Sequence, residues 1–126
     1  MTTKTTKATA ESLAAHCRSG TEAAALESLY HPDAVSVEPR PMPGSSSAET
    51  RGLPGILGKH AWWEGAMLEH ERRVDGPWFH GPDRFALAFH LDFTERHSGL
   101  RRVMHEVGIY TVDDAGRIIR EEFFGT

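Results

Sequence analysis

The sequence predicts an α+β fold with a largely antiparallel sheet. Two helical patterns open the chain, and strand patterns follow with a single helical pattern between them. Helices segregated from strands in this way are typical of α+β domains. The 126 residues contain no internal repeat and no linker, so we expect one domain over residues 9–126. Residues 1–8, polar and rich in Thr and Lys, are expected to form a disordered tail.

The first two helices are marked by residues that favour helix termini. Thr9 is expected to cap a helix over residues 10–19. Thr21 is expected to cap a second helix over residues 22–30, and Pro32 then disfavours helical backbone at the residue before it. Both helices carry apolar residues on one side, so we expect them to cover the sheet.

A short strand, a loop and a third helix follow. Residues 34–38 alternate in polarity as strands do. Residues 39–50 are dense in Pro, Gly and Ser, so we expect a loop that can act as a flap over a site. A third helix is predicted from Leu53 or Pro54 to about Glu71. Its apolar side forms a stripe wide enough to lie across a sheet: Ile56, Leu57, His60, Trp63, Met67 and Leu68.

The C-terminal half is rich in strand patterns. Two Gly-Pro pairs around Trp78 and Phe79 predict a short strand between turns. The clearest alternation in the chain covers residues 85–93. One face of that strand is apolar throughout: Phe85, Leu87, Phe89, Leu91 and Phe93. The Asp and Gly residues of positions 113–116 suit a tight reversal after the strand of residues 101–112, so a hairpin closes the chain.

The strand over residues 101–112 is apolar on both faces, so both faces need cover. The helices can cover one face. The other face requires either a second subunit or curvature of the sheet around a cavity. Glu106 interrupts the face that carries Met104 and Tyr110. A carboxylate at such a position must line a cavity, form an ion pair with a nearby arginine, or shift its pKa.

The composition excludes several classes of protein. Hydrophobic residues make up 39% and charged residues 25%, as in ordinary globular domains. A net charge of −4, with scattered Lys and Arg, argues against nucleic-acid and membrane-surface partners. No apolar run is long enough to span a membrane, no secretory signal opens the chain, and the single Cys17 suits the cytoplasm. The eight His residues lack metal-ligand spacing, so we expect neither a metal nor a cofactor.

Two strings carry a resemblance to a known family. LYHPDAVSVEP follows the first two helices, and IYTVDDAGRIIREEFFG forms the closing hairpin. Over about residues 10–125 the chain resembles the nuclear transport factor 2-like superfamily. More narrowly, it resembles the SnoaL-like and ketosteroid-isomerase-like branch. The motifs are patterns of strand and turn, which specify the fold and not the reaction.

The resemblance implies a cone-shaped, strongly curved antiparallel or mixed sheet, three helices that enclose a pocket, and a homodimer formed through the sheet. Ketosteroid isomerases carry their general base directly before a proline at the end of the first strand, where this chain has Glu38 and Pro39. Their oxyanion-hole tyrosine and protonated aspartate have no match, because this chain offers Ala14 or Ala15 and Gly108 at those places. Steroid isomerisation is therefore not expected.

The candidate catalytic residues are polar groups on strand faces that otherwise look buried. Glu38 is the expected base, with His90, Asp92 or Glu106 as its acid or orienting partners. Glu38 can instead face solvent or an arginine, and His90 and Asp92 can instead lie on the wet side of the sheet or in a dimer interface. The expected ligand contacts surround the pocket: Trp63, Met67, Phe79, Tyr110, Glu122 and Phe124.

Two functions of different class stay open. The first is a cofactor-free acid–base enzyme of the isomerase, dehydratase or cyclase type, acting on a small hydrophobic molecule. The second is non-catalytic, namely a domain that binds a small ligand in the same pocket or associates as a dimer. Carboxylate substitutions separate the two, because they remove turnover in the first case and matter little in the second.

Overall fold

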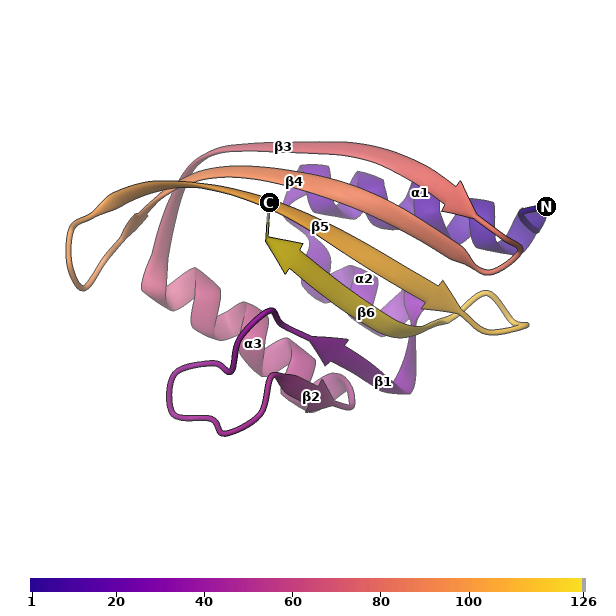
Figure 1. The fold of residues 1–126 in the computed structure, drawn as a ribbon, viewed down its shortest axis with the longest axis horizontal. Helices are drawn as coiled ribbons and strands as arrows, with labels where there is room; N and C mark the ends of the chain where they lie inside the picture. Colours follow the sequence, from indigo (N-terminus) through magenta and orange to yellow (C-terminus); the bar gives the residue numbers. More distant parts are fainter. Residues whose placement is uncertain (126) are drawn as a thin grey trace.

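The computed structural model describes residues 1–125 and has an α+β architecture, as the sequence predicts (Figure 1). Those residues form three helices and six strands, in the order α1 (Lys4–Ser19), α2 (Glu22–Leu29), β1 (Tyr30–Val37), β2 (Glu49–Arg51), α3 (Leu53–Ala66), β3 (Met67–His80), β4 (Arg84–Glu95), β5 (Arg101–Val112) and β6 (Ile118–Gly125). The strands join one sheet in the order β2-β1-β6-β5-β4-β3. The β1–β6 pair is parallel and the other pairs are antiparallel, so the sheet is mixed.

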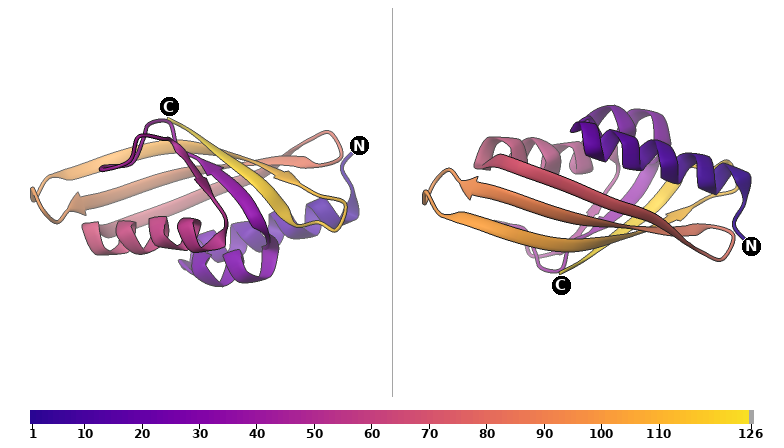
Figure 2. Two further views of the ribbon diagram at one scale, coloured as in Figure 1. Left: turned by 90° about the horizontal axis from the view of Figure 1, so that it is seen from below. Right: turned by 90° about the horizontal axis from the view of Figure 1, so that it is seen from above.

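The three helices lie on one face of a curved sheet (Figure 2). Helix α1 packs along β3 and β4, and α3 packs against β1, β2 and β3. The core fills the space between the helices and this inner face of the sheet. Its largest fully buried side chains include Leu13, Leu26, Ile56, Phe85, Leu87, Tyr110 and Ile118. Within residues 1–125, no helix is long and apolar enough to cross a membrane.

Strand β4 shows the alternation that its sequence predicts. Phe85 and Leu87 are completely buried under the helices, and Leu91 and Phe93 are buried as well. The residues between them point to the outer face of the sheet, which no helix of the described chain covers. On that outer face, Val103 of β5 is 66% exposed. The two faces of β5 therefore differ: the inner face is covered within the chain, and the outer face is not.

The predicted disordered tail is wrong for residues 4–8, because α1 begins at Lys4. Thr3 caps the helix by accepting a hydrogen bond from the Thr6 backbone N–H at 3.1 Å. The Thr6 hydroxyl donates to the Pro82 carbonyl at 2.9 Å, which holds the first turn against the β3–β4 connection. Thr9 is buried inside the helix, where it donates to the Gly116 carbonyl at 2.6 Å and does not act as a cap. The cap of α1 is therefore Thr3 and not the predicted Thr9.

The predicted third helix is five residues too long, since α3 ends at Ala66 and β3 begins at Met67. Residues 67–80 pair with β4 over its whole length, from Met67 opposite Glu95 to His80 opposite Arg84. This ladder outweighs the helical periodicity of the segment, because each pairing satisfies backbone groups with a neighbouring strand. The short strand expected between turns is the end of this long strand, and it contains the cis Gly76-Pro77 peptide.

Candidate functional site

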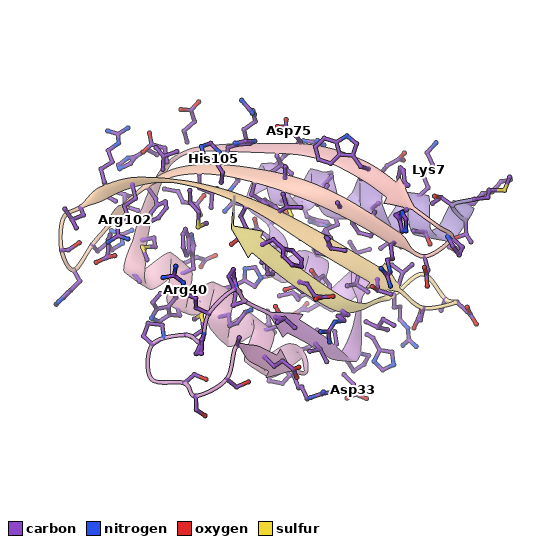
Figure 3. All side chains as sticks on the ribbon, viewed as in Figure 1. Lys7, Asp33, Arg40, Asp75, Arg102 and His105 are labelled. Atoms are coloured by element: carbon purple, nitrogen blue, oxygen red, sulfur yellow. The ribbon has the colours of Figure 1, made fainter. Side chains whose placement is uncertain are left out.

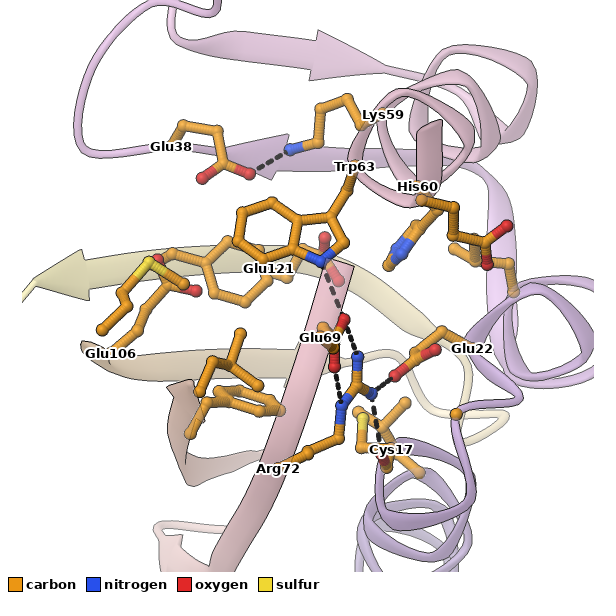
Figure 4. Close-up of a pocket in the computed structure, with 18 of the residues that line it drawn as sticks. Cys17, Glu22, Glu38, Lys59, His60, Trp63, Glu69, Arg72, Glu106 and Glu121 are labelled. Carbon is orange, nitrogen blue, oxygen red and sulfur yellow. Dashed lines mark hydrogen bonds and ion pairs between the residues drawn. The ribbon is translucent and has the colours of Figure 1, made fainter. Parts of the chain in front are cut away.

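A cavity of about 570 Å³ lies between the helices and the inner face of the sheet (Figure 4). All three helices contribute to its wall, together with residues of β1, β3, β4, β5 and β6. Much of the wall is apolar, and it includes Leu13, Leu26, Trp63, Phe89, Leu91 and Phe123. A hollow of this size and character suits a small organic molecule.

Glu106 of β5 carries its carboxyl group into this apolar wall. Its pKa is raised from 4.5 to about 7, first by burial and then by the negative charges of Glu38 and Glu121, against the lowering effect of the Lys59 ammonium. Among residues 1–125, no side-chain hydrogen bond or ion pair engages the Glu106 carboxyl. Its proton is therefore gained and lost near neutral pH, where it can serve a ligand.

Glu38 and Lys59 form an ion pair at the cavity wall, with 2.6 Å between Nζ and Oε1 (Figure 4). Glu38 directly follows β1, and Lys59 lies on α3. The Lys59 ammonium also donates to the Ser36 hydroxyl at 2.7 Å and lies 5.8 Å from the ring centroid of Phe123. The sequence-predicted base is therefore engaged by a lysine that the sequence did not point out, although Lys59 lies one turn before Trp63 on the apolar stripe of α3.

Glu121 of β6 is a second internal carboxyl group, only 2% exposed. The Tyr30 hydroxyl donates to its Oε1, and the Ser36 hydroxyl donates to its Oε2 at 2.6 Å. Because Ser36 also accepts from Lys59, a continuous hydrogen-bonded chain runs from Tyr30 through Glu121, Ser36 and Lys59 to Glu38. Such a chain fixes the orientation of each member and links the buried floor of the cavity to Glu38.

Tyr110 of β5 presents a hydroxyl group to the cavity. Its ring is 2% exposed and stacks on Phe85 with 4.9 Å between ring centroids. No hydrogen bond of the described chain uses the hydroxyl, yet residues 1–125 contain no fully buried side-chain oxygen without a partner. The oxygen must therefore keep some accessible surface, and the cavity that Tyr110 lines supplies it.

An arginine cluster closes another part of the wall (Figure 4). Arg72 of β3 donates to both carboxylate oxygens of Glu69, at 2.8 and 2.7 Å, to the Cys17 carbonyl at 2.8 Å, and to Glu22. The Trp63 indole N–H donates to Glu69 at 2.8 Å. The cluster joins β3 to all three helices, so it holds the shape of the cavity. Burial raises the pKa of the Cys17 thiol to about 12, which makes it a structural group and not a nucleophile.

Four of the residues predicted from the sequence lie together at this cavity: Glu38, Glu106, Trp63 and Tyr110. Met67 and Phe79 do not line it. Met67 is the first residue of β3, beyond the end of α3, and Phe79 lies near the far end of that strand, where it is 38% exposed. The expectation that they contact a ligand is therefore wrong, because both belong to the long strand β3, which carries them away from the cavity.

His90 and Asp92 point away from the cavity, on the outer face of the sheet. His90 contacts His105 of β5 and lies 3.3 Å from the Asp75 carboxylate of β3; His105 and Asp75 are labelled in Figure 3. Asp92 is half-buried on that face and accepts two hydrogen bonds of 2.9 Å from Arg101. The expectation that they assist Glu38 is therefore wrong. The phenylalanine residues of β4 face the cavity side, so His90 and Asp92, which alternate with them, face away from it.

A β-bulge in β6 reverses the expected facing of its last residues. The β5–β6 register shifts between the pairs Val112–Ile118 and Thr111–Arg120. One extra residue in a strand moves every later side chain to the opposite face. Glu122 and Phe124, the predicted contacts, therefore point outward, and Phe124 is 48% exposed. Their neighbours in the sequence, Glu121 and Phe123, take the inward positions.

Within residues 1–125, no three His, Cys, Asp or Glu side chains are arranged to hold a metal ion. The site is built instead from carboxyl groups, hydroxyl groups and aromatic rings. Glu106 can exchange a proton, Lys59 and Tyr110 can donate hydrogen bonds, and the aromatic rings can hold an apolar body.

The fold and the cavity define a protein of the nuclear transport factor 2-like class, and a comparison with solved structures narrows this class. A candidate SnoaL-like polyketide cyclase from Mesorhizobium loti, whose name also carries the term carbohydrate phosphatase, is 33% identical to this chain. The match has a TM-score of 0.84 and covers 94% of this chain and 97% of the other. The chain belongs to the SnoaL-like family.

More distant structures share the fold alone. A nuclear transport factor 2-like protein of unknown function from Burkholderia pseudomallei matches with a TM-score of 0.74 at 14% identity, over 98% of this chain and 92% of that one. A candidate isomerase from Bacillus subtilis matches with a TM-score of 0.71 at 15% identity, over 98% of this chain and 84% of that one. No family model matches the chain, and no curated protein matches it.

Proposed function

We propose that the protein is a cofactor-free acid–base enzyme that moves a proton on a small, largely apolar molecule, in an isomerisation, dehydration or cyclisation. The observation that carries this proposal is the position of Glu106, a carboxyl group with a pKa of about 7 in the wall of an apolar cavity. A general acid or base is most effective when its pKa lies near the working pH.

The chemistry needs a single group that can hold a proton between two steps. The Glu106 carboxylate removes a proton from an acidic carbon of the substrate, and the C–H bonding electrons pass into an adjacent carbonyl group to form an enolate. The resulting Glu106 carboxyl group then returns the proton to another atom of the same molecule, which completes an isomerisation. In a dehydration the proton goes to the departing hydroxyl group, which leaves as water.

The neighbours of Glu106 support this role. The negative charges of Glu38 and Glu121 raise its pKa, and the positive charge of Lys59 lowers it in part. Lys59 is held by Glu38 and Ser36, and Tyr110 offers a free hydroxyl, so both are placed to stabilise negative charge that develops on an oxygen atom of the substrate. In this proposal Glu38 positions Lys59. Glu106, and not the sequence-predicted base Glu38, is the group that carries the proton.

Deuterium exchange tests the proposal without a known substrate. Cyclohexanone, 2-tetralone and related ketones are incubated with the protein in D₂O, and NMR follows deuterium uptake at the carbons next to the carbonyl. We expect exchange that accelerates through an apparent pKa near 7, where Glu106 ionises. Glu106→Gln should lower the rate roughly 100-fold or more.

The control is Glu122→Gln, which removes an outward carboxylate of β6 next to Glu121 and should leave the rate unchanged. Exchange by Glu106→Gln at the wild-type rate would remove Glu106 from the mechanism. The ketones can also bind in the cavity while their exchange stays slow in every variant and at every pH. The protein would then be a non-catalytic ligand-binding domain.

We also propose a homodimer formed through the outer face of the sheet. That face is left uncovered within the described chain, and several large apolar side chains are exposed on or beside it: Trp78, Val103, Ile119 and Phe124. Exposed apolar side chains on an uncovered sheet face are typical of a protein–protein interface. A second copy is the expected occupant because the resemblance to this family implies association through the sheet.

A further inference from the structure

The wall of the cavity carries more carboxyl groups than cations. Its acidic side chains are six: Glu22, Glu38, Glu64, Glu69, Glu106 and Glu121. Its Arg and Lys side chains are three: Arg18, Lys59 and Arg72. A cavity lined by an excess of one charge sign attracts ligands of the opposite sign, because its low-dielectric wall weakens screening.

The cations of the wall are already engaged by the protein. Lys59 pairs with Glu38 at 2.6 Å, and Arg72 pairs with Glu69 at 2.7 Å and also with Glu22. Arg18 donates to the backbone carbonyls of Val74 and Gly76, at 3.1 and 3.0 Å. Among residues 1–125, no cation forms an ion pair with Glu106, although the nearby Lys59 ammonium lowers its pKa.

Glu106 therefore lacks a counter-ion, although its carboxyl group is mostly buried and lines the cavity. An internal carboxylate without a partner is costly, and a ligand that brings a positive charge removes that cost. Tyr110 gives a second, independent sign of a polar ligand group on the same face of the same strand. Its side chain is 2% exposed, and its unpartnered hydroxyl reaches the cavity.

The rest of the wall favours an organic cation over a bare metal ion. Six aromatic side chains line the cavity: Tyr30, Trp62, Trp63, Phe89, Tyr110 and Phe123. The faces of such rings attract cations electrostatically and also bury apolar substituents. Lys59 already uses one of them, since its ammonium lies 5.8 Å from the centroid of Phe123.

We propose that the cavity binds a small protonated amine with apolar substituents, whose ammonium group donates hydrogen bonds to the Glu106 carboxylate and the Tyr110 hydroxyl oxygen. The apolar substituents then lie against the aromatic and aliphatic wall. This inference rests on the proposed function, because it names the substrate class of the same cavity. It predicts that the molecule on which Glu106 acts carries an ammonium group.

Binding of an amine depends on the ionisation of Glu106. The charged groups that face it are Glu38 after β1, Lys59 on α3 and Glu121 on β6. Below pH 7 the carboxyl group is protonated in the free protein, so an amine must displace that proton. Above pH 7 the carboxylate is already formed, and the amine binds without this cost. A neutral ligand of the same shape shows no such dependence.

Calorimetry with two molecules of nearly equal shape tests the proposal. Cyclohexylmethylamine is protonated throughout the range of the experiment, and cyclohexylmethanol is its neutral counterpart. At pH 8 we expect the amine to bind roughly tenfold more tightly or better, as hydrogen bonds to charged groups allow. At pH 5.5 the preference should shrink, and binding of the amine should release protons to the buffer.

Glu106→Gln should abolish the preference for the amine and leave the affinity for the alcohol almost unchanged. Tyr110→Phe should weaken binding of the amine several-fold. Glu122→Gln is the matched control, because it removes an equal charge from the outer face, and it should keep the preference. Circular dichroism checks that each variant is folded. Equal or tighter binding of the alcohol by the wild type, or an amine preference that survives in Glu106→Gln, would overturn the proposal.

The outcomes separate this inference from the proposed function. If neutral ketones exchange through Glu106 and the amine shows no preference, the enzyme class stands and the substrate class is wrong. If the amine binds through Glu106 and no ketone exchanges, the ligand class stands and the proposed catalysis fails.

Discussion

The ring of Tyr110 lies over Gly108, so closely that a Cβ atom at Gly108 would be 2.9 Å from the tyrosine hydroxyl oxygen. The two residues lie two positions apart on β5 and face the cavity side. Glu106 lies a further two positions along the same face. The missing side chain at Gly108 therefore makes room for the Tyr110 ring beside the carboxyl group.

Gly108→Ala should displace this ring and destabilise the fold. Overpacking of a dense core costs about 1–3 kcal/mol. Urea denaturation measures the loss, and ligand affinity should fall with it. Gly125→Ala is the control, because nothing lies within 4 Å of a Cβ at Gly125. Equal stability of the Gly108→Ala protein and the wild type would show that the ring has another place to go.

The two tyrosines of the chain should respond differently to loss of the hydroxyl. Tyr30→Phe removes a donor from the buried Glu121 carboxyl, so it should cost about 1–3 kcal/mol of unfolding free energy. Tyr110→Phe removes a hydroxyl that the protein does not use, so it should cost less than about 0.5 kcal/mol while weakening ligand binding. Thermal and urea unfolding of both variants make the comparison. A larger loss of stability in Tyr110→Phe than in Tyr30→Phe would contradict this assignment of the two hydroxyl groups.

Stability should fall with rising pH because of Glu106. Its pKa is about 7 in the folded protein against 4.5 for the free side chain, so between these values the folded state binds the proton more tightly than the unfolded state. The free energy of unfolding therefore declines from pH 4.5 to 7, by about 3 kcal/mol at most from this group.

Glu106→Gln should remove that decline. The unfolding free energy of the variant minus that of the wild type should rise between pH 4.5 and 7 and stay constant above pH 7. Urea denaturation at pH 5 and pH 8 measures this difference. A difference between the two proteins that does not vary with pH would contradict the raised pKa.

The proposed homodimer should depend on the outer face of β5. Val103→Asp places a charge on an apolar side chain that is 66% exposed, so it should convert the dimer to a monomer at micromolar concentration. Leu100→Asp is the control, since Leu100 is 54% exposed but precedes the strand. Sedimentation velocity gives the answer, and a wild-type protein that sediments as a monomer would end the proposal.

The sequence was sufficient for the parts of the fold in which one pattern dominates. Burial of one face of β4 follows from five large apolar residues at strand spacing, and Glu106 is conspicuous because it interrupts such a face. The sequence did not show that this apolar face of β4, and not the face with His90 and Asp92, turns toward the cavity. The family resemblance then gave the mixed sheet and the three covering helices, since no local pattern encodes which strands are neighbours.

The failures arose where distant pairing decides local geometry. The bulge of β6 depends on its register with β5, so nothing in the string RIIREEFFG shows that Glu121 and Phe123 turn inward. The end of α3 depends on the pairing of Met67 with Glu95. The chain from Tyr30 to Glu38 joins residues far apart in the sequence, and only the folded structure reveals it.

The most direct test of the account is a titration of Glu106 itself. Carbon-13 labelling of the glutamate side chains lets NMR follow each carboxyl carbon between pH 3 and pH 9, and Glu106→Gln identifies the signal. We expect a midpoint of about 7 for Glu106. A midpoint near 4.5 would show that the carboxyl group is solvated as in a free side chain, and the proposed proton transfer would lose its basis.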